Sequence, residues 1–227
     1  MFRLRCLPRT VGFLLSLPVA LVAQGTVSGR VTMQERPGEQ STDLGNTIIY
    51  LVPTDTARPR TRPTATSIAM NGRAFVPRVR VITPGSRVDF PNQDPFSHNI
   101  FSTASGAAFD LGLYPAGRSR DALFRRAGVF PIYCNIHPRM TSFVVVTPTP
   151  YFAMSGADGR WTISGVPPGR YQARVWHERA PEVSQDIEVG AEGRVGVDAQ
   201  LDARGFRFAQ HKNKFGREYD RTGRDRY

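Results

Sequence analysis

Short runs of β-branched and aromatic residues, separated throughout by glycine and proline, constrain the fold of this chain more than any other feature. The 227 residues include 21 Gly and 18 Pro, spread along the chain rather than clustered. Short strands with regular turn signals are typical of all-β sandwiches or barrels. Amphipathic helix periodicity is nearly absent, and its best candidate, 121–127, is too short to matter. We expect strands in the runs 76–81, 87–90, 129–134, 143–147, 171–176 and 187–189.

The N-terminus has the layout of a secretory signal peptide. Three arginines precede an apolar run at 11–23, and small residues follow it up to Gly25. The run is about 13 residues long, whereas a membrane-spanning helix needs roughly 20. We therefore expect residues 1–25 to be a cleaved signal peptide and the mature protein to be periplasmic or otherwise exported. A retained membrane anchor is the alternative.

Cysteine usage narrows the possible chemistry. The sequence has two cysteines, of which Cys6 lies in the expected signal peptide. Cys134 is then the single cysteine of an exported protein, and it has no partner for an internal disulfide. Either this thiol is buried and inert, or a metal holds it.

The neighbours of Cys134 favour a metal. Cys134, His137 and Met140 follow the pattern C-x2-H-x2-M where a strand enters a tight loop, and His98 supplies a second imidazole at the start of another strand. Two imidazoles and one thiolate form the trigonal set of a blue-copper site, with methionine as a weak, long axial ligand. We therefore predict one type 1 copper, bound by His98, Cys134, His137 and Met140.

Other interpretations of these residues were weighed against copper. A lone histidine or cysteine is more often structural, but the four residues in this order and spacing favour a metal site. Zinc prefers four strong donors, so the methionine argues against it. The sequence has only four histidines, and two of them, His177 and His211, lie outside this region, so a trinuclear copper cluster is excluded. We expect His177 to be a surface strand residue.

The stretch 66–147 resembles the cupredoxins, the group of plastocyanin and amicyanin. The resemblance is carried by 75–77, 84–94, 97–100, 127–130 and 133–140, the last reading Tyr-Cys-Asn-Ile-His-Pro-Arg-Met. It implies a Greek-key β-sandwich over 64–148, with the four predicted ligands binding copper and a short ligand loop most like that of amicyanin. It also implies that Asn99 hydrogen-bonds across to the loop at Asn135.

A second pattern follows the first. The segment 157–178 resembles the carboxypeptidase regulatory-like module, a small transthyretin-like β-sandwich, with turns at Asp158-Gly159 and Pro168-Gly169. The opening strands of such a module are found far upstream, near 27–31 and 46–52. We therefore expect a discontinuous sandwich over 26–58 and 149–202, with the cupredoxin inserted; a tandem arrangement is the alternative. The module carries no peptidase chemistry, so we expect a scaffolding or docking role. The combination resembles exported proteins of the methylamine-utilisation type.

The C-terminal segment 203–227 carries eight Lys or Arg against three acids, in a chain of net charge +11. We expect a mobile basic tail that contacts an anionic membrane surface or an acidic redox partner; a solvated tail without a specific partner is the alternative. Export argues against nucleic acid as the partner.

The leading hypothesis is that this monomer is not an enzyme but an exported protein that transfers single electrons between redox partners. His137 is expected at the solvent-facing edge of the site, within a contact patch of Phe96, Ile136 and Pro138. One alternative is a copper-binding or copper-delivery protein without a redox partner. Another is an interaction or adhesion module with a vestigial metal site.

Overall fold

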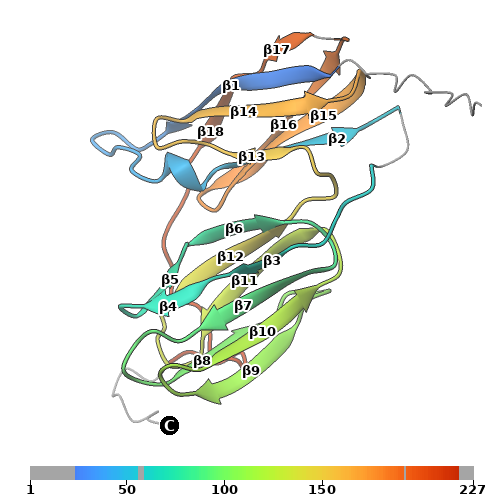
Figure 1. Ribbon diagram of the computed structural model, residues 1–227. Helices are drawn as coiled ribbons and strands as arrows, with labels where there is room; N and C mark the ends of the chain where they lie inside the picture. The colour runs from blue at the N-terminus through green and yellow to red at the C-terminus, as the bar shows by residue number, and fades with distance from the viewer. Residues whose placement is uncertain (1–23, 56–58, 192, 220–227) are drawn as a thin grey trace, which may run out of the picture.

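The computed structural model describes residues 24–55, 59–191 and 193–219, which form two units made of β-strands (Figure 1). We call residues 64–148 the site unit and residues 24–55 with 149–202 the flanking unit. The expected signal peptide lies almost wholly outside the described residues. Within them, no helix is long and apolar enough to cross a membrane.

The flanking unit is built from both ends of the described chain, in two four-stranded sheets. In each sheet a strand from the N-terminal part pairs with strands more than a hundred residues later. The chain therefore leaves this unit after its second strand and returns to it with its thirteenth. The first sheet contains β1 (Gly25–Gln34), β14 (Arg160–Val166), β17 (Arg194–Gly196) and β18 (Ala199–Asp202), and the second runs β13 (Phe152–Met154), β2 (Ile48–Pro53), β15 (Gly169–His177), β16 (Ala180–Val189).

The predicted turn at Asp158-Gly159 requires glycine at its second position. Gly159 has a φ of +79°, and a Cβ there would lie 2.2 Å from the carbonyl oxygen of Val31. The carbonyl of Gly159 in turn accepts a 2.8 Å hydrogen bond from the N–H of Val31. Only glycine meets both demands, so the turn before β14 can close against β1.

The site unit contains the ten strands from β3 to β12, which lie in the sequence between the two parts of the flanking unit. Its largest sheet has the order β6-β12-β11-β8-β9, and a three-stranded sheet, β10-β7-β3, and a β4-β5 pair accompany it. The parallel pairing of β6 with β12 and of β3 with β7 shows that the chain crosses over between sheets rather than forming consecutive hairpins. The strands are β3 (Ala65–Ser67), β4 (Ala69–Asn71), β5 (Ala74–Val76), β6 (Val79–Ile82), β7 (Ser86–Pro91), β8 (His98–Ser102), β9 (Phe109–Tyr114), β10 (Ser119–Phe124), β11 (Gly128–Cys134) and β12 (Thr141–Val146).

The all-β prediction is confirmed, and the only helix in the described residues is the 3-10 turn η1 (Leu44–Asn46). One local expectation was wrong. The run 76–81 is divided between β5 and β6, because Pro77 has no N–H to donate to a neighbouring strand. The segment 121–127 forms no helix, in line with its short periodicity, and its first four residues lie in β10, which pairs with β7.

Each unit has its own apolar core, and a third cluster joins the two units. In that cluster the ring of Trp176 from β15 lies 5.5 Å from the ring of Phe143 from β12. Beside it, Arg78 of the site unit donates to both carboxylate oxygens of Glu178, whose side chain is nearly buried. Apolar burial and a paired charge therefore hold the units together.

Residues 203–219 do not form the mobile tail that we expected. The chain runs from β18 along the side of the site unit to its far end (Figure 1). There His211 is 9% exposed and its ring stacks on Tyr133, with the ring centroids 4.5 Å apart. The basic charge of this segment predicted that it would be solvated. Its aromatic side chains and its backbone instead contact the site unit.

His177, expected on the surface, is buried beside an ion cluster of the flanking unit. Its Nε2 lies 3.2 Å from the carbonyl oxygen of Asp43. Arg179 spans the two acids of the cluster, with Nη2 at 2.7 Å from both Glu35 and Asp43. The hydrogen bond from Arg179 lowers the pKa of Glu35 below its ordinary value, against the opposing effect of burial.

We predict that Arg179→Ala lowers the free energy of unfolding by about 2–4 kcal/mol, because two carboxylates are left without their cation. The loss should shrink as pH falls through the lowered pKa of Glu35, since the ion pair stabilises only while this carboxylate is charged. Denaturant unfolding at pH 7 and pH 3 measures both effects. Arg204→Ala, which removes a fully exposed ion pair with Asp202, is the control and should be neutral. Equal effects of the two variants would contradict this prediction.

Candidate metal centre

Two neighbouring strands bring the predicted donors together. β8 begins at His98 and β11 ends at Cys134, and the two strands pair antiparallel with Cys134 opposite Ile100. Side chains alternate along a strand, so His98 lies on the same face as Ile100, and Cys134 faces the same side from the next strand. All three side chains are fully buried. The pairing therefore places one imidazole and one thiol side by side in the interior.

The loop after β11 adds a second imidazole. Nδ1 of His98 lies 3.4 Å from Sγ of Cys134, and Nδ1 of His137 lies 3.6 Å from the same sulfur. These three donor atoms all lie within 4.8 Å of one another, and they make the one group of three or more His, Cys, Asp or Glu donors found among the described residues. This group can hold a metal ion.

Backbone hydrogen bonds close the loop that carries these residues. The N–H of Met140 donates to the carbonyl of His137 at 2.9 Å, and the N–H of Cys134 donates to the carbonyl of Met140 at 3.2 Å. The side chain of Met140 is almost fully buried in the core of the site unit. Three predicted residues thus converge through their donor atoms, and Met140 closes the same loop through its backbone.

Asn99 hydrogen-bonds across to the loop at Asn135, as expected, and so links the two predicted ligand segments. Its carbonyl oxygen, rather than its side chain, accepts a 2.8 Å hydrogen bond from the N–H of Asn135. Its side-chain amide instead donates to Oδ1 of Asp110 on β9 at 2.6 Å. The backbone of Asn99 therefore joins the start of β8 to the end of β11, and its side chain joins β8 to β9.

Asp94 orients the ring of His98. Oδ2 of Asp94 lies 2.8 Å from Nε2 of His98, and the carboxylate also accepts the N–H groups of Gly72 and Arg73. Burial alone would raise the pKa of Asp94, but these hydrogen bonds hold it below its ordinary value. An ionised carboxylate accepts a hydrogen bond from Nε2–H, which leaves the lone pair of Nδ1 directed toward Cys134.

The protonation equilibria of the donors are set mainly by burial. Burial lowers the pKa of His98, and burial with the nearby charges of His98 and Arg73 lowers that of His137. Both imidazoles are therefore biased toward the neutral form that binds metals. Burial raises the pKa of the Cys134 thiol. A coordinated cation reverses that bias, because a coordinating thiol is deprotonated outright.

The donor distances fit a bound metal ion. For metal–nitrogen and metal–sulfur bonds of about 2.0 and 2.3 Å, trigonal or tetrahedral geometry separates the two donors by about 3.5–3.8 Å. The measured separations are 3.4 and 3.6 Å. Copper prefers donors of these kinds: a thiol, two imidazoles biased toward the neutral form, and a thioether. The thioether here is that of Met140, in the loop after Cys134.

An aromatic ring and a cation cover the site on the side of His137. The ring of Phe96 lies 5.3 Å from that of His98 and 5.6 Å from that of His137. The guanidinium of Arg73 lies 5.2 Å above Phe96. Of the donors, His137 is partly exposed whereas His98 and Cys134 are not, so His137 is the ligand candidate nearest to solvent.

Sequence reasoning missed three residues around the site, Asp94, His211 and Tyr219. Asp94 carried a weak signal, since an acid four residues before a predicted ligand histidine is well placed to orient its ring. Nothing in the pattern near residue 211 indicates contact with a loop more than seventy residues earlier. That proximity is decided by the path of the chain after β18.

Comparison with known proteins gives matches at the level of structure alone. No protein-family profile matches the chain, and no curated protein sequence matches it. Among solved structures, a purple cupredoxin from Nitrosopumilus maritimus matches 36% of this chain and 99% of its own length, with 26% identity and a TM-score of 0.34. Two reduced amicyanin mutants match 37% and 43% of this chain and 82% and 99% of their own lengths, at 22% and 19% identity, each with a TM-score of 0.35. These neighbours are cupredoxins, and each covers less than half of this chain.

We predict that Asp94→Asn weakens metal binding by about 10–100-fold, the usual effect of removing a partner that orients a ligand histidine. An amide offers one acceptor oxygen where the carboxylate offers two, so its NH2 group would face N–H donors. Titration with Co(II) and Cu(II) measures the change in Kd. Asp89→Asn, at an exposed position on β7, is the control and should bind as the wild type does. Unchanged affinity in Asp94→Asn would show that the carboxylate does not orient His98.

Proposed function

We propose that this protein is an exported type 1 copper protein that carries single electrons between redox partners, rather than an enzyme. Its copper would be held by His98, Cys134 and His137, with Met140 as the weak axial ligand. Bound there, copper would supply a one-electron couple between Cu(I) and Cu(II). The observation that carries the proposal is the convergence of two imidazole nitrogens on one buried cysteine sulfur, at 3.4 and 3.6 Å.

The choice of copper over zinc rests on the fourth donor. A zinc site would require another strong nitrogen, sulfur or oxygen donor. The nearest acid, Asp94, is engaged with the outer nitrogen of His98 and not with the donor side of the ring. The thioether of Met140 is the candidate left in the loop, and it is a soft ligand suited to copper.

The protein's own contribution to electron transfer is rigidity. The hydrogen bonds from Cys134 to Met140, from Met140 to His137 and from Asn135 to Asn99 fix the loop and β8 before any metal binds. Donors that keep their positions in both oxidation states limit the rearrangement that accompanies each transfer. A rigid site of this kind favours an electron carrier over a delivery protein, whose site must open to release its cargo.

The surface around His137 supports an acidic redox partner. Its aromatic groups are paired with cations: Arg73 lies over Phe96, and Arg139 lies 5.2 Å over the ring of Phe208, which is 46% exposed. An apolar surface flanked by two arginines fits a partner whose own apolar patch is bordered by acidic residues. The flanking unit would act as a carboxypeptidase regulatory-like scaffold.

The charge-transfer spectrum tests the central claim. We predict that the mature protein with one equivalent of Cu(II) shows an intense absorption band in the red, arising from the Cys134 thiolate. Cys134→Ser should abolish the band, because a hydroxyl is a hard and poor donor. Absorption and EPR spectroscopy on both proteins decide the question. A wild-type protein that binds one copper and stays colourless would contradict the proposal.

The axial position gives a second test. We predict that Met140→Gln retains copper but has a lower reduction potential, since an oxygen donor favours Cu(II) over Cu(I). Protein-film voltammetry measures the potential. Met154→Gln, an exposed methionine on β13, is the matched control and should leave it unchanged. If the two variants had the same potential as the wild type, Met140 would not be an axial ligand.

A further inference from the structure

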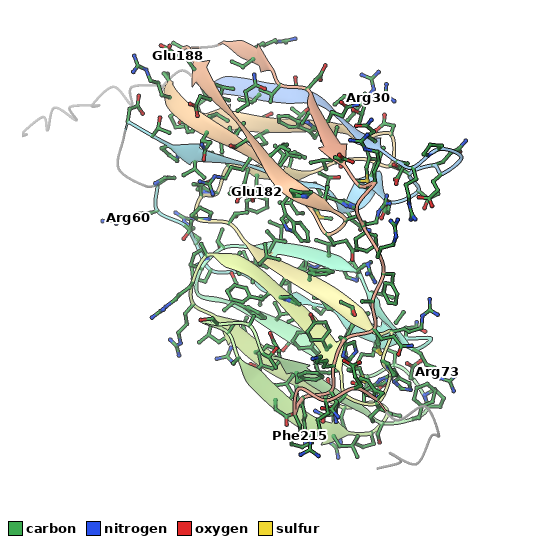
Figure 2. The ribbon with its side chains drawn as sticks, turned by 180° about the vertical axis from the view of Figure 1, so that it is seen from behind. Arg30, Arg60, Arg73, Glu182, Glu188 and Phe215 are labelled. Carbon is green, nitrogen blue, oxygen red and sulfur yellow. The ribbon has the colours of Figure 1, made fainter. Side chains whose placement is uncertain are left out.

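The chain beyond β18 reaches the far side of the predicted ligand loop and contacts it at several points. Figure 2 shows Phe215, on this segment, at the end of the site unit remote from the flanking unit. We call residues 206–219 the C-terminal strap. Its contacts with the loop are made by His211, Lys214 and Tyr219.

His211 makes the most buried of these contacts. Its ring stacks on that of Tyr133, the residue before Cys134, at 4.5 Å and an interplanar angle of 25°. Its Nε2 lies 3.3 Å from the carbonyl oxygen of His137 and its Nδ1 lies 2.9 Å from that of Lys212, and in the Nε2–H tautomer the ring donates to His137. The ring of Phe101 on β8 lies edge-on at 5.9 Å. One side chain therefore packs against β8 and β11 and holds the backbone of a predicted ligand.

Tyr219 holds the backbone of a second predicted ligand. Its hydroxyl donates to the carbonyl oxygen of Cys134 at 3.2 Å, and its ring meets that of His211 edge-on at 5.5 Å. The carbonyl of Cys134 stands at the end of β11, where the loop begins, and the carbonyl of His137 lies within the loop. Two side chains of the strap thus bond to the backbone carbonyls of two predicted ligands, and the contact of His211 adds to the bond that the His137 carbonyl accepts from Met140.

Lys214 ties the loop to the strand that carries His98. Its backbone N–H donates to Oδ1 of Asn135 at 2.8 Å, and its ammonium lies 2.7 Å from Oδ2 of Asp110. The other oxygen of Asp110 accepts the amide of Asn99, next to His98. Lys214 therefore closes a chain of hydrogen bonds that runs from beside Cys134 to beside His98.

We propose that the C-terminal strap positions the donor set, with His211 and Tyr219 as positioning residues that set the geometry of the Cys134–His137 loop. The proposal rests on the proposed copper function for the identity of the metal. Groups that orient ligands from outside commonly change metal affinity by 10–100-fold when they are lost. Here those groups would come from a segment more than seventy residues beyond the loop.

The first test needs no metal. In the metal-free full-length protein, we expect His211→Ala to accelerate hydrogen exchange at the loop amides of Cys134, Asn135 and Met140 by about tenfold, the change produced by roughly 1.4 kcal/mol. Tyr219→Phe removes one hydroxyl and keeps the ring, so it should have a smaller effect in the same direction. Lys212→Ala is the matched control, because this exposed side chain lies on the strap and its contact is with Glu218.

The second test uses copper. We expect His211→Ala and Tyr219→Phe to weaken Cu(II) binding by about 10–100-fold and to shift the thiolate band and the EPR parameters, while Lys212→Ala matches the wild type. Faster exchange with unchanged affinity and spectra would overturn the proposal, since the strap would then stabilise the backbone without positioning the donors. Unchanged exchange in His211→Ala would overturn it as well. A wild-type protein that gives no thiolate band refutes the copper function, whereas the exchange experiment judges the strap by itself.

Discussion

The antiparallel pairing of β8 with β11 is the constraint on which the rest of the site depends. The ladder places Cys134 opposite Ile100 and so brings His98, two residues earlier, onto the same buried face. A slip of one residue would turn every side chain of a strand to the other side of the sheet and separate the thiol from the imidazole. β11 is also held on its other edge by β12, whose first residues follow the ligand loop directly. The loop of six residues between Cys134 and Thr141 is therefore fixed at both ends by one sheet.

The burial of the donor residues also determines their protonation. Desolvation lowers the pKa of both imidazoles and raises that of the thiol, so without a cation the three donors are neutral and can lie within 4.8 Å of one another at little cost. The Asp94 carboxylate remains ionised because backbone N–H groups donate to it, and it directs one nitrogen of His98 inward. The surroundings thus favour the neutral form of the donors, and a bound metal ion would supply the charge that deprotonates the sulfur.

Contacts at both ends of the site unit connect it to the rest of the chain. Near the flanking unit, apolar side chains of β2 and β15 pack on β6 and β12, and Arg78 and Glu178 form an ion pair beside them. At the opposite end, the strap brings the chain back after β18 and packs on β8 and β11. The flanking unit therefore sets the starting point of the strap, because the chain leaves its last strand, β18, and runs from there to the predicted ligand loop (Figure 1).

The sequence by itself determined the β character of the chain, through its short runs of strand-forming residues between glycines and prolines, and it singled out the donor residues. Cys134, His137 and Met140 are close in the chain, so their spacing alone predicts that they meet in one loop. His98 was found because a blue-copper site needs a second imidazole, and the structure brings it to the sulfur. The domain boundaries and the type of the flanking unit stay predictions, although the pairing of β1 and β2 with later strands is observed. Only the tertiary structure decided the burial of His177, the orientation of His98 by Asp94 and the contacts of His211, Lys214 and Tyr219. Apart from the pair Asp94–His98, these contacts join segments far apart in the sequence, and their residue types are as compatible with solvent as with a partner. The basic composition of 203–227 predicted a mobile tail for that reason, whereas stacking on Tyr133 and hydrogen bonds to the carbonyls of Cys134 and His137 determine where residues 203–219 lie.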